Sequence, residues 1–115
     1  MWYAAHAVLA IRFVEGAQTE WPIWENVYLI EADDDETAMQ KAETRAIQDA
    51  GDSNGTMRWR ERRARFEFKG IRKLITCTDG NRDGSELTFS EFVLASEEDV
   101  CHAAAGDEVV ARYVE

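Results

Sequence analysis

The sequence predicts an α+β fold, in which a curved antiparallel sheet carries one main helix on one face. Several segments alternate apolar and polar residues with the two-residue period of a β-strand, and only residues 38–50 show long helical spacing. Short polar breaks between the strand-like segments favour hairpins, which join antiparallel neighbours. Because 115 residues suit one hydrophobic core, we expect residues 1–115 to form a single α+β domain.

The first two strands are predicted at residues 2–14 and 23–32. In the first, the odd-numbered residues should face the core, and these are Tyr3, Ala5, Ala7, Leu9, Ile11 and Phe13. The second is rich in β-branched and aromatic side chains, and the polar residues 15–20 between them indicate a hairpin with a long loop. If this hairpin pairs symmetrically about residues 18 and 19, His6 lies opposite Glu31.

A helix is predicted to begin within the run Asp33-Asp34-Asp35-Glu36, because this run supplies a capping oxygen, a glutamate three positions after Asp33, and negative charge that complements the helix dipole. Small and apolar residues then recur at three- and four-residue spacing, and Gly51 is typical of a helix end. The residues with this spacing are Ala38, Met39, Ala42, Ala46, Ile47 and Ala50.

The rest of the chain predicts three more strands and a short helix. Residues 57–77 read as one long strand, or as two joined at Gly70, where a bulge is expected. Residues 87–95 and 109–114 read as strands, with a helix between them that Ser96 caps and that runs to about Ala105. The expected order is therefore β-β-α-β-β-α-β.

The net charge of −10 is unevenly distributed. Residues 1–56 carry −8, residues 57–73 carry +6 and residues 74–115 carry −8. An acidic surface repels phosphate backbones, so nucleic acid is an unlikely partner and a basic protein partner is favoured. No apolar run is long enough for a membrane helix and no signal-peptide pattern is present, so we expect a cytoplasmic protein with no membrane partner. Cys77 and Cys101 are expected to be free thiols.

Residues Asp79-Gly80-Asn81-Arg82-Asp83-Gly84 resemble a calcium-binding loop, since oxygen ligands occupy its first, third and fifth positions and a glycine the sixth. The twelfth position, however, holds Ser90, and Glu91 comes one residue late. The segment before the loop is strand-like rather than helical. A hairpin turn explains the composition without a metal, so we expect neither a metal site nor a cofactor.

A basic strip with interleaved aromatic residues runs from Arg58 to Lys73. Such a strip could bind single-stranded nucleic acid by stacking and charge. The favoured interpretation is a solvated strand face, on which Arg65, Glu67 and Lys69 point outward and pair across the sheet with acidic neighbouring strands.

No catalytic residue is predicted. His6 and His102 are the only histidines, and no phosphate-binding glycine loop or nucleophile motif is present. A pair of His6 with Glu31 could act in acid–base chemistry, but a local hydrogen bond is the commoner outcome on a strand.

Aromatic side chains supply the candidate interaction surface: Trp2, Trp21, Trp24, Tyr28 and Trp59. Trp21 and Trp24 could equally form a small cluster under the hairpin loop. Trp2, Trp24 and Tyr28 are expected on the sheet face away from the helix. Such a face is usually covered by another part of the chain or by another subunit, so a homodimer is expected.

The order of several short motifs resembles the small bacterial domains known as domain of unknown function 4288. The motifs are Trp2-Tyr3-Ala4-Ala5-His6, residues 24–32, Asp35-Glu36-Thr37-Ala38, residues 66–74 and residues 83–92. The resemblance covers nearly the whole chain and supports the α+β fold. It implies no activity for any residue.

Three functional hypotheses remain. The leading one is a non-enzymatic protein-interaction module, of the inhibitor or immunity type. The second is a small-molecule binder or minor enzyme with a pocket walled by Trp2, Trp24, Tyr28 and His6. The third is single-stranded nucleic-acid binding through the strip from Arg58 to Lys73.

Overall fold

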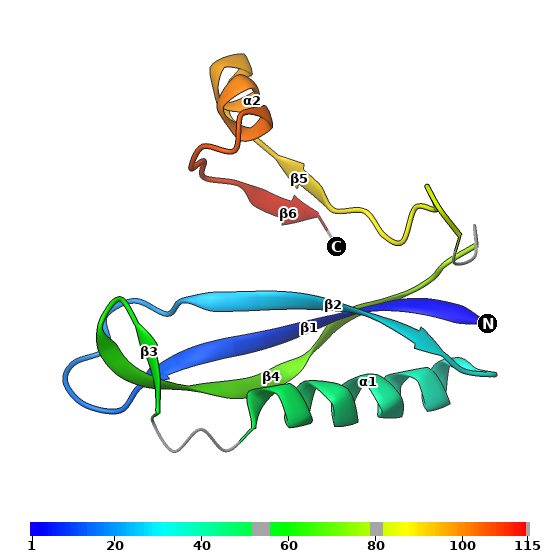
Figure 1. The fold of residues 1–115 in the computed structure, drawn as a ribbon. Helices are drawn as coiled ribbons and strands as arrows, with labels where there is room; N and C mark the ends of the chain where they lie inside the picture. Colours follow the sequence, from blue (N-terminus) through cyan, green and yellow to red (C-terminus); the bar gives the residue numbers. More distant parts are fainter. Residues whose placement is uncertain (52–55, 79–81, 115) are drawn as a thin grey trace.

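The computed structural model describes residues 1–51, 56–78 and 82–114. Its main body is an antiparallel sheet in the order β2-β1-β4-β3. The four strands are β1 (Trp2–Phe13), β2 (Ile23–Glu31), β3 (Met57–Trp59) and β4 (Arg62–Thr76), and helix α1 (Asp35–Ala50) lies along one face (Figure 1). The predicted α+β class with one main helix on an antiparallel sheet is confirmed.

Strand β1 lies inside the sheet, between β2 and β4. All of its odd-numbered residues from Tyr3 to Phe13 are buried, as predicted, and several even-numbered ones are buried too. The β1–β2 register places His6 opposite Val27, so the predicted pairing with Glu31 is wrong. The pairing is centred nearer the N-terminus than residues 18 and 19, and within the loop Gln18 hydrogen-bonds the backbone of Ile11 and Phe13.

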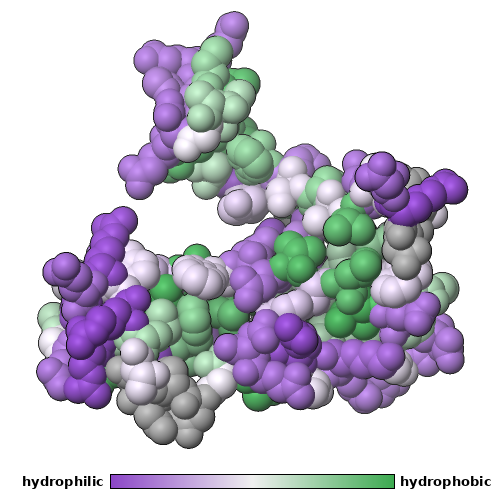
Figure 2. All heavy atoms as spheres, in the orientation of Figure 1, coloured by the Kyte–Doolittle hydropathy of each residue, from purple (hydrophilic) through white to green (hydrophobic). Residues whose placement is uncertain are grey.

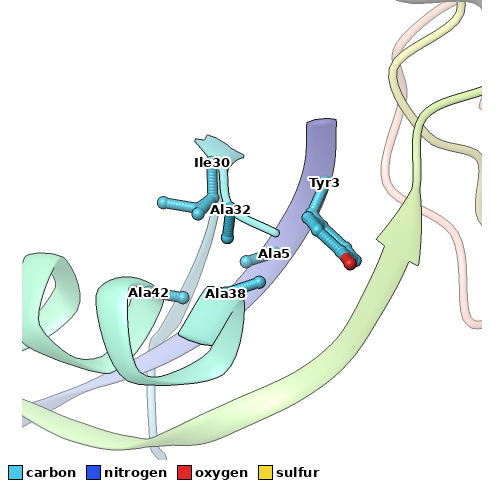
Figure 3. Close-up of a cluster of buried hydrophobic side chains, with 6 residues drawn as sticks. All are labelled: Tyr3, Ala5, Ile30, Ala32, Ala38 and Ala42. Carbon is cyan, nitrogen blue, oxygen red and sulfur yellow. The ribbon is translucent and has the colours of Figure 1, made fainter. Parts of the chain in front are cut away.

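Helix α1 packs closely on the sheet because its own buried residues are all alanines. Asp34 caps the helix by accepting a hydrogen bond from the Thr37 amide, as predicted. Ala38 and Ala42 then contact Tyr3, Ala5, Ile30 and Ala32 in one buried cluster (Figure 3). Ile47, which the helical spacing also placed on this face, is 57% exposed.

The segment 57–77 divides at Arg60 and Glu61, not at Gly70. Both residues have positive φ, 46° and 69°, and form the two-residue turn between β3 and β4. Strand β4 continues through Gly70, and its register against β1 shifts once on each side of this glycine. The pairing skips Lys69 on one side and Arg72 on the other. The bulge expected near Gly70 is therefore confirmed.

The last three elements form a separate unit, residues 91–114, which we call the C-terminal unit. It comprises β5 (Glu91–Val93), α2 (Glu97–Ala104) and β6 (Arg112–Val114). Strands β5 and β6 are shorter than predicted and form their own two-stranded sheet. The unit stands off the side of the main sheet opposite α1 (Figure 1). The radius of gyration is accordingly 16.5 Å, against about 13 Å for a compact chain of this length.

Candidate functional site

His6 is the buried polar side chain on the sheet face opposite α1. Its exposed fraction is 2%, and both ring nitrogens have partners. Nδ1 lies 2.9 Å from Oε2 of Glu25, and Nε2 lies 2.7 Å from Oγ1 of Thr88. We call these three residues the histidine anchor, because they join the sheet to the chain that leads into the C-terminal unit.

Strand register and the β4 bulge bring charge to this anchor. Glu25 pairs with Val8, two residues from His6 on β1, and so projects from the same face. Arg72 sits at the bulge, and its Nε donates to Oε1 of Glu25 over 2.7 Å. Partial burial disfavours the Glu25 carboxylate, but the hydrogen bonds and charges of Arg72 and His6 outweigh it and lower the pKa of Glu25.

Three side chains of the main sheet hold residues 87–89 against it. His6 contacts Thr88, the Lys73 ammonium donates to the Phe89 carbonyl over 2.6 Å, and the Cys77 thiol donates to the Leu87 carbonyl over 3.1 Å. Arg72 also lies over the Tyr113 ring at 4.9 Å, so it contacts the end of the C-terminal unit as well. The base of the unit is thus fixed to one region of the sheet.

The order of carboxylate, imidazole and hydroxyl in the anchor is the order used in hydrolytic triads. In a neutral imidazole, one nitrogen donates to Glu25 and the other accepts from Thr88. The surroundings favour a structural role. His6 is buried, and the ammonium of Lys73, its neighbour on β4, is already bonded to the Phe89 carbonyl. Across residues 1–51, 56–78 and 82–114, no group of three or more His, Cys, Asp or Glu could hold a metal ion.

The sequence pointed to His6 but to none of its true partners. Glu25 and Arg72 come together only through a register and a bulge, and Thr88 lies 82 residues away along the chain. The one available signal was Gly70, which marks the irregular stretch of β4 that positions Arg72.

The predicted aromatic residues do not share one face. Trp2 lies on the His6 face, whereas Trp24 and Tyr28 lie on the face of α1, where Tyr28 donates to Asp49 of the helix. Trp21 is stacked under Arg12, and Trp59 packs against Phe13. The prediction that Trp24 and Tyr28 occupy the face away from the helix is therefore wrong, and so is a single pocket walled by Trp2, Trp24, Tyr28 and His6. The predicted inward and outward residues of β2 are thus exchanged, because Trp24 and Tyr28 pair with the core-facing residues Leu9 and Ala5 of β1.

The basic strip makes intramolecular contacts along its length. Glu67 binds Arg12, Arg65 and Lys69, and Arg63 binds Glu15. Arg60 and Arg62 lie over the rings of Trp59 and Phe13. Outward-pointing, ion-paired side chains are what the solvated interpretation of this strand predicts. The calcium-like loop lies partly outside the described residues, at positions 79–81; Asp83 and Gly84 are exposed.

The C-terminal unit is the most exposed part of the molecule. None of the residues 91–114 is buried. Its exposed apolar side chains are Phe92, Val93, Val100, Val110, Tyr113 and Val114. The aromatic pair Phe92 and Tyr113 holds β5 and β6 together, and neither residue belongs to the interaction surface predicted from the sequence.

Comparison with known proteins adds the family. Within the described ranges, no helix has the length and apolarity to cross a bilayer. No curated protein and no solved structure matches the chain. A family model described as a domain of unknown function, DUF4288, matches residues 2–89, which include the whole main sheet, α1 and the histidine anchor. The chain therefore belongs to the DUF4288 family, and its C-terminal unit lies beyond the matched region.

Proposed function

We propose that this chain is a protein-interaction module of the inhibitor or immunity type, which binds another protein through its C-terminal unit and performs no catalysis. One observation carries the proposal: a folded unit of three elements presents its apolar side chains to solvent. The main sheet and α1 serve as the scaffold, and the histidine anchor fixes where the unit stands.

The exposed apolar side chains of the unit are large and close together in the chain. Val100 is 52% exposed, Val110 is 90% exposed and Tyr113 is 53% exposed. Several large apolar side chains exposed on one small folded unit favour a binding role, because contact with a partner removes them from water. Aromatic residues such as Tyr113 are common anchors of interfaces.

Charge and chemistry define the partner class. A net charge of −10 favours a partner with a basic surface. The buried, fully bonded His6 supports a binding role over a catalytic one. Two free thiols fit a reducing compartment, so we place the module in the cytoplasm.

The test is capture of a partner from host lysate with the full chain and two variants. The double substitution Val100→Asp/Val110→Asp should abolish capture, because it places charge in the apolar surface without disturbing a buried residue. The control is Ile47→Asp, at a comparably exposed position on α1, and this variant should capture the partner like the parent. Equal capture by all three proteins would contradict the proposal, and so would a parent that captures neither a host protein nor an untagged copy of this chain.

A further inference from the structure

We infer that the partner of the C-terminal unit is a second copy of this chain, whose basic sheet face receives the unit in a reciprocal two-fold dimer. This inference rests on the proposed function, since it names the partner of the same surface. It follows from the charge of the unit, the charge of the sheet face and the way the unit is held away from the body.

The receiving surface is the basic face, defined as Arg12, Arg58, Arg63, Arg65 and Lys69 with Glu67 among them. Strand register sets these residues on one side of the sheet: Arg12 pairs with Arg65, and Arg58 pairs with Arg63. They project opposite Ala64 and Phe66, which pack into the core on the other side. Glu67 binds Arg12, Arg65 and Lys69, and Glu15 contacts Arg63, so the five cations of the face still outnumber the two carboxylates that they contact.

An apolar stripe continues this face along the edge strand β2. Ile23, Val27 and Leu29 alternate on the side opposite α1, and they are 50%, 43% and 41% exposed. The basic face and the stripe together offer a partner both positive charge and apolar area.

The C-terminal unit has the matching properties. Residues 91–114 hold six acidic side chains and one arginine, a net charge of −5. Exposed apolar residues lie among them, on both strands and on α2. Opposite charges guide association and fix its orientation, whereas apolar contact supplies much of its free energy.

The unit does not cover the basic face of its own chain. Its base is held near His6 and Lys73, and Tyr113 is held at Arg72. The basic face lies farther along β1 and β4, toward the β3 end of the sheet. Figure 2 shows open space between the unit and the body, in keeping with a radius of gyration of 16.5 Å.

A two-fold axis satisfies both surfaces at once. The unit of each copy reaches the basic face of the other, so every contact is made twice and the assembly closes without growing into a filament.

Sedimentation equilibrium over a range of protein concentrations at low salt tests the dimer. The parent chain should dimerise, and added salt should weaken the dimer because its charge contacts are screened. The variant Arg63→Glu/Arg65→Glu should raise the dimer dissociation constant at least about tenfold, as should Glu91→Lys/Glu108→Lys, because each sets like charges against each other in both contacts. The control Lys41→Glu/Arg45→Glu makes the same change of net charge on α1 and should dimerise like the parent.

Mixing the two charge-reversed variants is the decisive arm. In a mixed dimer one contact pairs a reversed face with a reversed unit, and the other keeps the native signs, so dimerisation should return. Circular dichroism establishes that each variant is folded.

Four results would overturn the inference: a parent that stays monomeric at every concentration, a dimer unaffected by the charge reversals, a dimer weakened equally by the α1 control, or no recovery on mixing. A monomer with a radius of gyration near 13 Å by X-ray scattering would instead indicate that the unit closes on its own chain. If the parent is monomeric but Val100→Asp/Val110→Asp still abolishes capture from lysate, the interaction module stands and only its partner is different.

Discussion

The Glu67 carboxylate binds three of the five cations of the basic face. Arg12 donates its Nε to both Glu67 oxygens at 2.8 and 2.7 Å, and Lys69 and Arg65 approach within 3.2 and 3.5 Å. The hydrogen bond from Arg12, with Lys69 in support and against some desolvation, lowers the pKa of Glu67 to about 2. The ionised carboxylate is therefore more stable in the folded chain than in the unfolded one.

This depressed pKa predicts a pH-dependent stability. The contribution of Glu67 is fully present above about pH 4.5 and is lost as the pH falls toward about 2. Glu67→Gln should lower the free energy of unfolding by about 1 kcal/mol at neutral pH, since the site is partly solvated. The difference from the parent should vanish in acid. Urea denaturation at several pH values measures it.

Glu15→Gln is the matched control, because Glu15 contacts Arg63 at 3.4 Å with its side chain 78% exposed. It should change stability by no more than about 0.5 kcal/mol at any pH. A constant difference between Glu67→Gln and the parent down to acid pH would contradict the assigned ionisation.

The side of the sheet on which a single residue lies was predictable where the two-residue period of a strand determines it. The outward orientation of Arg65, Glu67 and Lys69 follows from Phe66 and Phe68 facing inward, and the structure confirms it; Arg65 and Lys69, however, pair with Glu67 of their own strand and not with acidic side chains of neighbouring strands. The partners of His6 were not predictable. Glu25 depends on the register of the first hairpin, and Thr88 lies 82 residues away along the chain.

Alanines set the distance between α1 and the sheet. Ala38, Ala42 and Ala46 are fully buried, so along this line the helix itself presents nothing larger than a methyl group to the side chains of the sheet. Close packing of this kind leaves no room for added atoms.

Ala42→Leu should therefore destabilise the fold by about 1–3 kcal/mol, because the larger side chain forces the helix away from the sheet. Thr44→Leu, on the exposed side of the same helix, should be neutral or slightly stabilising, since leucine is the better helix former. Thermal unfolding of the two variants decides it. Equal unfolding temperatures would mean that α1 is not held closely against the sheet.

Among the elements, the capping residues and the helical spacing of apolar residues predicted α1 well. The ends of the later strands and turns depend instead on tertiary contacts. The turn at Arg60 and Glu61 was missed because two-residue hairpin turns with positive φ usually contain Gly, Asn or Asp. The strand expected at 87–95 is short because residues 87–89 bond to side chains near the main sheet instead of to a neighbouring strand, and β6 pairs only with the three residues of β5 that remain.

The molecule as a whole is a compact body joined to a protruding unit through one fixed segment. The matched family region ends at residue 89, the last residue of that segment. No local pattern foretells such an attachment, because its two sides lie 82 residues apart in the chain. The prediction of one domain stays a prediction, and so does the protein partner.

Thr88→Val tests the attachment. The substitution keeps the shape of the side chain but leaves Nε2 of the buried His6 without a partner, so the free energy of unfolding should fall by about 1–3 kcal/mol. Amide hydrogen exchange should accelerate at residues 87–89 and through the C-terminal unit. Thr78→Val, at an exposed turn position, should leave both unchanged. Unaltered exchange in Thr88→Val would show that the anchor does not hold the unit.

The inner position of β1 also determines when this protein can fold during its synthesis. β1 is the first strand to be made, yet β4, which completes its pairing, ends at Thr76, and the residue that caps His6 comes later still. Pairing over such separations requires loop closure before any contact forms, which slows folding. The nascent chain therefore carries the apolar β1 unpaired on one edge until β4 has been made, and an exposed apolar edge of this kind favours binding by a chaperone.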